Sequence, residues 1–168
     1  MKRGLLTVFL ILLTLGAFAA EAKANLILST AIPEILRQGF IKDENDSISP
    51  TITVTSALSE DGASFTYVIE TNMLYPLAVT ATIAPFSTTG GSTTIQIAKV
   101  TVKEKGSETS DEFDIIKPKM SLISLTPQHS GVYRYEYYMN VLADQEQVEE
   151  AESGEYTTTM SIEIQSGN

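Results

Sequence analysis

The side chains best suited to chemistry in this sequence are a lone histidine, a run of carboxylates and a row of tyrosines. His129 is the only histidine, and the chain contains no cysteine. A metal site or a catalytic site built on His129 would need a second histidine or a cysteine as its partner, and the sequence has neither. It also has no Gly-x-Ser-x-Gly or Ser-x-x-Lys sequence and no phosphate-binding glycine loop. We therefore expect His129 in a surface loop, and no enzyme activity, cofactor or metal.

Carboxylates are concentrated between residues 144 and 155. They are Asp144, Glu146, Glu149, Glu150, Glu152 and Glu155. Such oxygens bind calcium in extracellular proteins, but their spacing here does not match an EF-hand loop. A run of like charge is more typical of a solvated loop, which is the interpretation we favour. An extracellular hydrolase would instead need two paired carboxylates, and a sequence does not reveal such pairs.

Tyrosines recur between residues 133 and 138. In a strand, Tyr133, Tyr135 and Tyr137 share one face and Tyr138 lies on the other. The row is either an exposed binding stripe or part of a packed core. Cross-strand aromatic packing inside a sandwich is the commoner use, and we favour it.

Two Gly-x-Tyr sequences, at residues 131–133 and 154–156, each precede a predicted strand. The glycine permits a tight turn. The tyrosine can then bury its ring while its hydroxyl bonds to the backbone at the corner, as in the tyrosine corner of immunoglobulin-like sandwiches.

The elements that must position these side chains are short strands. Apolar and polar residues alternate at period two in segments rich in β-branched and aromatic residues. The predicted strands are Thr51–Thr55, Ser64–Ile69, Leu77–Ile83, Thr94–Val102, Met120–Leu125, Val132–Leu142 and Tyr156–Ile164. Polar loops are expected at Lys42–Ser49 and Glu104–Glu112, and a short helical connector at Glu34–Gln38. This pattern predicts an all-β fold, a single-domain, immunoglobulin-like antiparallel β-sandwich.

The first 24 residues have the three-part layout of a secretory signal peptide. Lys2 and Arg3 precede an apolar stretch, Leu5–Leu15, that is shorter than the roughly 20 residues a spanning helix needs. Three Ala-x-Ala frames follow, at residues 17–19, 20–22 and 22–24, and we favour cleavage after the last. Residues 25–168 would then form the β-sandwich domain. We expect an exported protein, periplasmic, at the cell surface or extracellular, without membrane insertion.

The predicted mature chain is strongly acidic. The whole chain has a net charge of −10, and removal of residues 1–24 takes away three positive charges and one negative charge, which leaves −12. A surface of this charge repels nucleic acids and anionic lipids, so we expect no nucleic-acid partner. Without cysteine there is no disulfide, and the hydrophobic core alone must stabilise the fold.

The two ends of the predicted mature chain resemble a known family. Residues 25–33 form an extended apolar segment that leads into a proline, and residues 153–164 form a Gly-x-Tyr strand. This layout resembles chaperone–usher fimbrial subunits, especially colonisation-factor pilins, and is similar to spore coat U-like secreted domains. In this family an immunoglobulin-like sandwich is incomplete, and the N-terminal extension of another subunit fills its groove by β-strand addition.

The resemblance implies roles for seven residues. The groove-filling side chains of a donor or edge strand, within residues 25–36, would be Leu26, Leu28 and Ile32. The strand that borders the acceptor groove would contribute Tyr156, Met160, Ile162 and Ile164. The implied partners are other copies of this chain or related subunits, together with a periplasmic chaperone.

Two functions are compatible with these observations. The leading one is an exported structural subunit of a fimbria-like or surface assembly. The alternative is a monomeric secreted module that presents loops, residues 144–155 among them, to a protein or glycan. Because Ile27 and Ala31 are apolar on the opposite face of the segment, a strand buried within its own sandwich would have the same sequence pattern.

Overall fold

The computed structural model of the chain describes residues 29–41, 47–88, 93–115 and 119–167. The predicted signal peptide and donor residues Leu26 and Leu28 lie outside these ranges. The chain divides into two units, Met1–Ile32 and Pro33–Asn168. In the first unit, residues 29–32 are exposed and belong to no helix or strand. The described strands all belong to the second unit.

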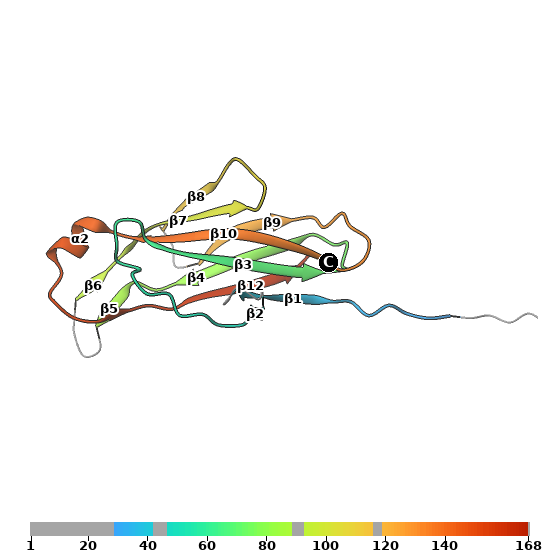
Figure 1. Cartoon of the computed structure of the whole chain (residues 1–168), viewed down its shortest axis with the longest axis horizontal. Coiled ribbons are helices and arrows are strands. Elements are labelled where there is room, and N and C mark those ends of the chain that lie inside the picture. The colour runs from blue at the N-terminus through green and yellow to red at the C-terminus, as the bar shows by residue number, and fades with distance from the viewer. Residues whose placement is uncertain (1–28, 42–46, 89–92, 116–118, 168) are drawn as a thin grey trace, which may run out of the picture. The chain divides into compact units, whose positions relative to one another are not determined.

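Six antiparallel strands form the larger sheet, in the order β2-β1-β3-β10-β7-β8 (Figure 1). They are β1 (Leu36–Ile41), β2 (Ile48–Ser49), β3 (Ala63–Thr71), β7 (Ile97–Glu104), β8 (Asp111–Asp114) and β10 (Tyr133–Ala143). The central strand β10 is the longest, and it pairs with β3 from Tyr133↔Thr71 to Val141↔Ala63. Its partner on the other side is β7.

Two smaller antiparallel sheets complete the fold, with the orders β12-β4-β9 and β11-β5-β6. Their strands are β4 (Leu77–Ile83), β5 (Phe86–Thr88), β6 (Thr94–Ile95), β9 (Lys119–Leu125), β11 (Tyr156–Thr157) and β12 (Met160–Ser166). Between β10 and β11 lies the short helix α2 (Gln145–Glu150). Figure 1 shows α2, β5 and β6 at one end of this unit and the C-terminus at the other.

The hydrophobic core lies between the sheets. Alternate residues of β4, from Leu77 to Ile83, are buried, as the period-two pattern predicts. They pack with buried residues of all three sheets, among them Tyr67 of β3, Ile95 of β6 and Val100 of β7. The predicted all-β sandwich is therefore confirmed, and it is held together by apolar side chains rather than disulfides.

Six strands have the order of an immunoglobulin-like sandwich with one position empty, while β9, which pairs with β4 but lies between β7 and β10 in the chain, has no counterpart in it. In that fold one sheet has the order A-B-E-D and the other has C, F and G side by side. Here β1-β3-β10-β7 corresponds to A-B-E-D, and β4 and β12 correspond to C and F. Within the described residues, β12 pairs only with β4, and no strand occupies the place of G.

Two predicted elements are wrong. Residues 36–41 form β1 instead of a helical connector over Glu34–Gln38, because five backbone positions pair with β3. That pairing outweighs the weak tendency of so short a segment to form a helix. Residues 51–55 are not a strand, although Ile52 and Val54 are half-buried between exposed threonines. The alternation identified which side chains face the core, but not whether the backbone has a ladder partner.

Three further differences concern boundaries. The predicted strand Thr94–Val102 divides into β6 and β7 at Gln96, whose backbone instead bonds to Asp144 N and Gln147 Oε1, both at 2.9 Å. Tyr156–Ile164 divides into β11 and β12, which belong to different sheets. The expected charged loop at Glu104–Glu112 is shorter, because β8 begins at Asp111.

Candidate functional site

The strongest candidate site is the free side of β12, which we call the open edge. β12 pairs with β4 along its whole length, from Met160↔Ile83 to Ser166↔Leu77. On its other side no strand in the described part of the chain pairs with it. Backbone N–H and C=O groups of a free strand edge form a template for a further strand. The open edge can therefore bind an extended segment through backbone hydrogen bonds.

Three of the four predicted acceptor residues lie together on this strand. Met160, Ile162 and Ile164 are half-buried, share one face of β12 and pack against the core. Full burial of an exposed side chain of this size contributes about 1.5 to 3 kcal/mol of favourable free energy. Because these three are only half-buried, a strand that covered them would obtain the remaining part. Tyr156 is not among them, because it lies in β11 and pairs with β5.

Tyr156 has a structural role instead. Its hydroxyl donates a 3.1 Å hydrogen bond to the carbonyl oxygen of Glu152, four residues earlier. This is the arrangement expected of a tyrosine corner after Gly154. The Tyr156 ring packs against the core, so the residue fixes the turn that leads from α2 into the last strands.

Strand β1 carries two inward-facing residues that the sequence did not identify. Leu36 and Gln38 stand opposite Thr71 and Ile69 on β3, both of which are buried in the core. Residues directly opposite in paired strands share a face, so Leu36 and Gln38 point inward. Both are nevertheless exposed. The inner face of the larger sheet is thus incompletely covered along β1, and in the sheet β12-β4-β9 the half-buried side chains of β12 are incompletely covered too.

Residue Ile32 is the one predicted donor residue that the structure describes. Its side chain is 83% exposed, the highest value of any large hydrophobic residue in the described ranges. The backbone of residues 33–35, directly after Ile32, is hydrogen-bonded to the side chain of Asn72. Asn72 Oδ1 accepts from Ile35 N at 2.7 Å, and Asn72 Nδ2 donates to Pro33 O at 2.9 Å.

Two of the three tyrosines on the inner face of β10 lie in the core, as predicted, and the third is exposed. Tyr135 and Tyr137 are buried. Tyr133, nearer the end of the sandwich, is 42% exposed, and the His129 ring stacks on it with 3.8 Å between centroids. His129 is exposed in the loop before β10, as expected, and its ring also lies near that of Tyr135, with 6.5 Å between centroids.

The acidic segment is more ordered than predicted. Asp144 caps α2 by accepting from Gln147 N at 3.2 Å and from Gln147 Nε2 at 3.0 Å. Glu146, Glu149 and Glu150 of the helix are exposed. Among the residues that the structure describes, no three histidine, cysteine or acidic side chains gather in a manner that could hold a metal ion.

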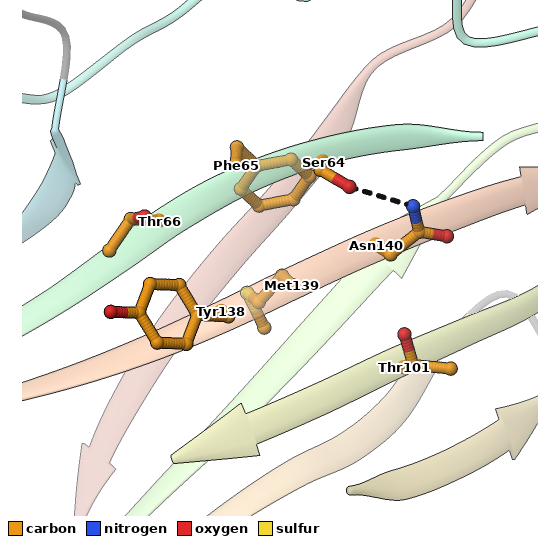
Figure 2. A pocket seen from close by; sticks show the side chains of 7 residues that line it. All are labelled: Ser64, Phe65, Thr66, Thr101, Tyr138, Met139 and Asn140. Carbon is orange, nitrogen blue, oxygen red and sulfur yellow. Dashed lines mark hydrogen bonds between the residues drawn. The ribbon is translucent and has the colours of Figure 1, made fainter. Parts of the chain in front are cut away.

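The outer face of the larger sheet is polar. A row of ion pairs crosses it: Arg37–Glu70 at 3.9 Å, Arg134–Glu70 at 4.0 Å, Arg134–Glu136 at 3.1 Å and Lys105–Glu136 at 2.9 Å. Beside it lies a shallow depression of about 270 Å³, lined among others by Tyr138, Thr66, Thr101 and the pair Asn140 and Ser64, which is joined by a hydrogen bond of 2.9 Å (Figure 2). So shallow a depression does not enclose a small ligand.

Comparison with known proteins gave no relative: no protein-family model and no curated protein sequence matches this chain. In the described residues no helix has the length and apolar character needed to cross a membrane. The function of this chain is therefore inferred from the geometry and chemistry of its candidate site.

Proposed function

We propose that this chain is an exported structural subunit that assembles with other copies of itself, or with related subunits, by β-strand addition. The observation that carries the proposal is the open edge of β12, which has three half-buried apolar side chains and no partner strand in the described part of the chain. A fold that leaves such an edge uncovered is prone to pair with another chain. In a surface assembly that tendency is the function.

The N-terminal segment has the length and pattern to fill this edge. Strand β12 has seven residues, and the segment from Leu26 to Ile32 also has seven. Leu26, Leu28 and Ile32 are at even offsets, so they face the same side of an extended strand. At about 3.3 Å per residue, the two strands match in length, near 23 Å. Their apolar side chains would cover Met160, Ile162 and Ile164.

Export and chaperone assistance are parts of the same proposal. The signal-peptide layout of residues 1–24 would direct the chain out of the cytoplasm. An uncovered edge is an aggregation hazard before assembly, so a periplasmic chaperone would have to protect it. The final location would be the cell surface or the extracellular medium.

The test is the mass of the protein that begins at Asn25, measured by size-exclusion chromatography with light scattering. We expect polymers, or a requirement for a chaperone to obtain soluble protein. Leu28→Asp should abolish the polymers, because it places a charge on the donor face. Ile27→Asp is the matched control: it introduces the same charge one residue away, on the opposite face, and should polymerise more than Leu28→Asp.

The contrary result is also well defined. If the chain from Asn25 is a stable monomer and the chain from Pro33 unfolds, residues 25–32 complete their own sandwich and strand addition between chains is wrong. The secreted binding module would then replace the structural subunit, and alanine substitutions in residues 144–155 would test its contact loop.

A further inference from the structure

Exposed large hydrophobic side chains gather at one end of the sandwich. At this end β1 begins, β3 ends and β10 begins, and we call it the entry end. Its exposed side chains are Leu36 (40% exposed), Leu74 (60%), Tyr75 (48%), Val132 (56%) and Tyr133 (42%). The only other large hydrophobic residues with comparable exposure in the described ranges are Ile32 and Tyr138.

Contacts around one buried residue bring these side chains together. Thr71, the last residue of β3, pairs with Leu36 on one side and with Tyr133 on the other. Leu74 and Tyr75 follow Thr71 within four residues, in the loop between β3 and β4. The five side chains thus lie at the same end of the sandwich, and exposed apolar side chains that gather in this way mark sites of protein association.

The donor segment is joined to this end without a linker. Pro33 is held by Asn72, and Glu34 Oε1 accepts a 2.8 Å hydrogen bond from the Tyr75 hydroxyl. Ile32, the last donor residue, immediately precedes Pro33. A copy that bound Leu26–Ile32 on its open edge would therefore meet the entry end directly.

Charge favours an apolar contact between copies. A chain that begins at Asn25 carries a net charge of −12, and two such surfaces repel one another. The five exposed side chains of the entry end are uncharged, and the carboxylate beside them, Glu34, already accepts a hydrogen bond from Tyr75, so contact there brings few carboxylates together. A few buried side chains at the centre of an interface, tyrosines prominent among them, supply most of the binding energy in many complexes.

We propose that the entry end is a second contact surface of the assembly, against which the copy that accepts the donor segment packs. This inference depends on the proposed function, because the donor segment determines which copy lies there. It adds a separate claim: strand addition alone does not account for the binding between the two copies, because contacts of Leu74, Val132 and Tyr133 contribute to the binding free energy.

The experiment compares the dissociation of polymers made from variants of the chain that begins at Asn25. Leu74→Ser and Tyr133→Ser should each speed dissociation about tenfold, the effect of losing roughly 1.4 kcal/mol at an interface. Tyr138→Ser is the matched control. It removes a tyrosine of similar exposure, 46%, from the outer face of the same strand, and should leave dissociation unchanged.

A synthetic peptide of residues 25–32 separates this inference from the proposed function. It is added to the Leu28→Asp chain, whose own donor is disabled, with and without Tyr133→Ser. The peptide lacks an entry end, so its affinity should be the same for both. If the peptide binds and polymers form, but Leu74→Ser and Tyr133→Ser dissociate like Tyr138→Ser, the second contact surface is wrong. If the peptide does not bind and no polymer forms, strand addition fails and the contact surface with it.

Discussion

Gly39 of β1 lies so close to Ser49 of β2 that a Cβ atom on Gly39 would stand 2.5 Å from the Ser49 carbonyl oxygen. It would also stand 2.6 Å from Cγ2 of Ile48. A side chain at position 39 would fit only if the backbone shifted. Because glycine has none, β2 can approach β1 closely enough to pair with it. Phe40 and Ile41 of β1 thereby pair with a neighbour strand, whereas β12 has none on its free side within the described residues.

Gly39→Ala should therefore destabilise the protein by about 1 to 3 kcal/mol, the usual cost of overpacking. Urea denaturation measures the free energy of unfolding. Gly154→Ala is the control, because its Cβ would meet Thr88 and Tyr156 at ordinary distances of 3.6 and 3.9 Å. Equal destabilisation by the two substitutions would show that the close approach of β2 does not matter.

Asp144→Ala should destabilise the fold by about 1 kcal/mol, because the cap of α2 is lost. The same side chain also accepts from Gln147 Nε2, and Gln147 Oε1 in turn accepts from Gln96 N. Asp144→Asn should retain most of the stability, since asparagine is an equally good cap. Thermal unfolding of the two variants side by side decides the point. A larger loss for asparagine than for alanine contradicts a capping role.

Stability should fall steeply in alkaline solution. Burial raises the pKa of the Tyr67 and Tyr137 hydroxyls above the ordinary value near 10. The folded state then holds these protons more tightly than the unfolded state. Their contribution is fully present below about pH 10 and is lost as the pH rises toward the folded-state pKa, by up to about 1.4 kcal/mol per pH unit for each tyrosine.

The measurement is urea denaturation at several pH values from 8 to 12. Tyr137→Phe should reduce the loss of stability above pH 10, because one of the two titrating groups is gone. If the slope of unfolding free energy against pH is the same in both proteins, Tyr137 does not contribute to it.

Glu70→Gln should cost about 1 to 3 kcal/mol, because Glu70 lies between Arg37 and Arg134 and its side chain is only 21% exposed. Glu163→Gln is the control: its pair with Lys119 is 3.4 Å long, but the side chains are 63% and 53% exposed. Exposed pairs of this kind contribute about 0 to 1 kcal/mol. Added salt should reduce the difference in unfolding free energy between Glu70→Gln and the unsubstituted protein only slightly, because partly buried ion pairs are weakly screened. Equal costs for the two substitutions would contradict a special role for the row.

Much of the fold could be predicted because alternation reports burial directly. Leu77–Ile83 was predicted with the bounds that β4 has, and Met120–Leu125 differs from β9 by one residue. Where local preference and long-range pairing disagree, the sequence misleads. Pro33 and Gly39 flank residues 34–38 at the positions typical of a short helix, but pairing with β3, some 30 residues away, determines the backbone from Leu36 onward.

The candidate site could be predicted in part for a related reason. The resemblance implies Met160, Ile162 and Ile164, and the structure places these three on one face of β12 because they alternate on one strand, which is a local property. Tyr156 was grouped with them because the sequence does not reveal the change of sheet between β11 and β12. Leu36 and Gln38 were missed, since their inward orientation comes from register with Thr71 and Ile69.

The last strand ends where the first begins. The N–H of Gly167 donates a 2.9 Å hydrogen bond to Pro76 O, in the same loop as Tyr75, which binds Glu34. Strand β10 separates this end from α2 by eleven residues, or about 36 Å. A fluorescent protein or foreign epitope fused after residue 168 would stand beside the entry end and obstruct its contacts. An epitope inserted near α2 would lie at the opposite end of the sandwich and would leave the entry end free.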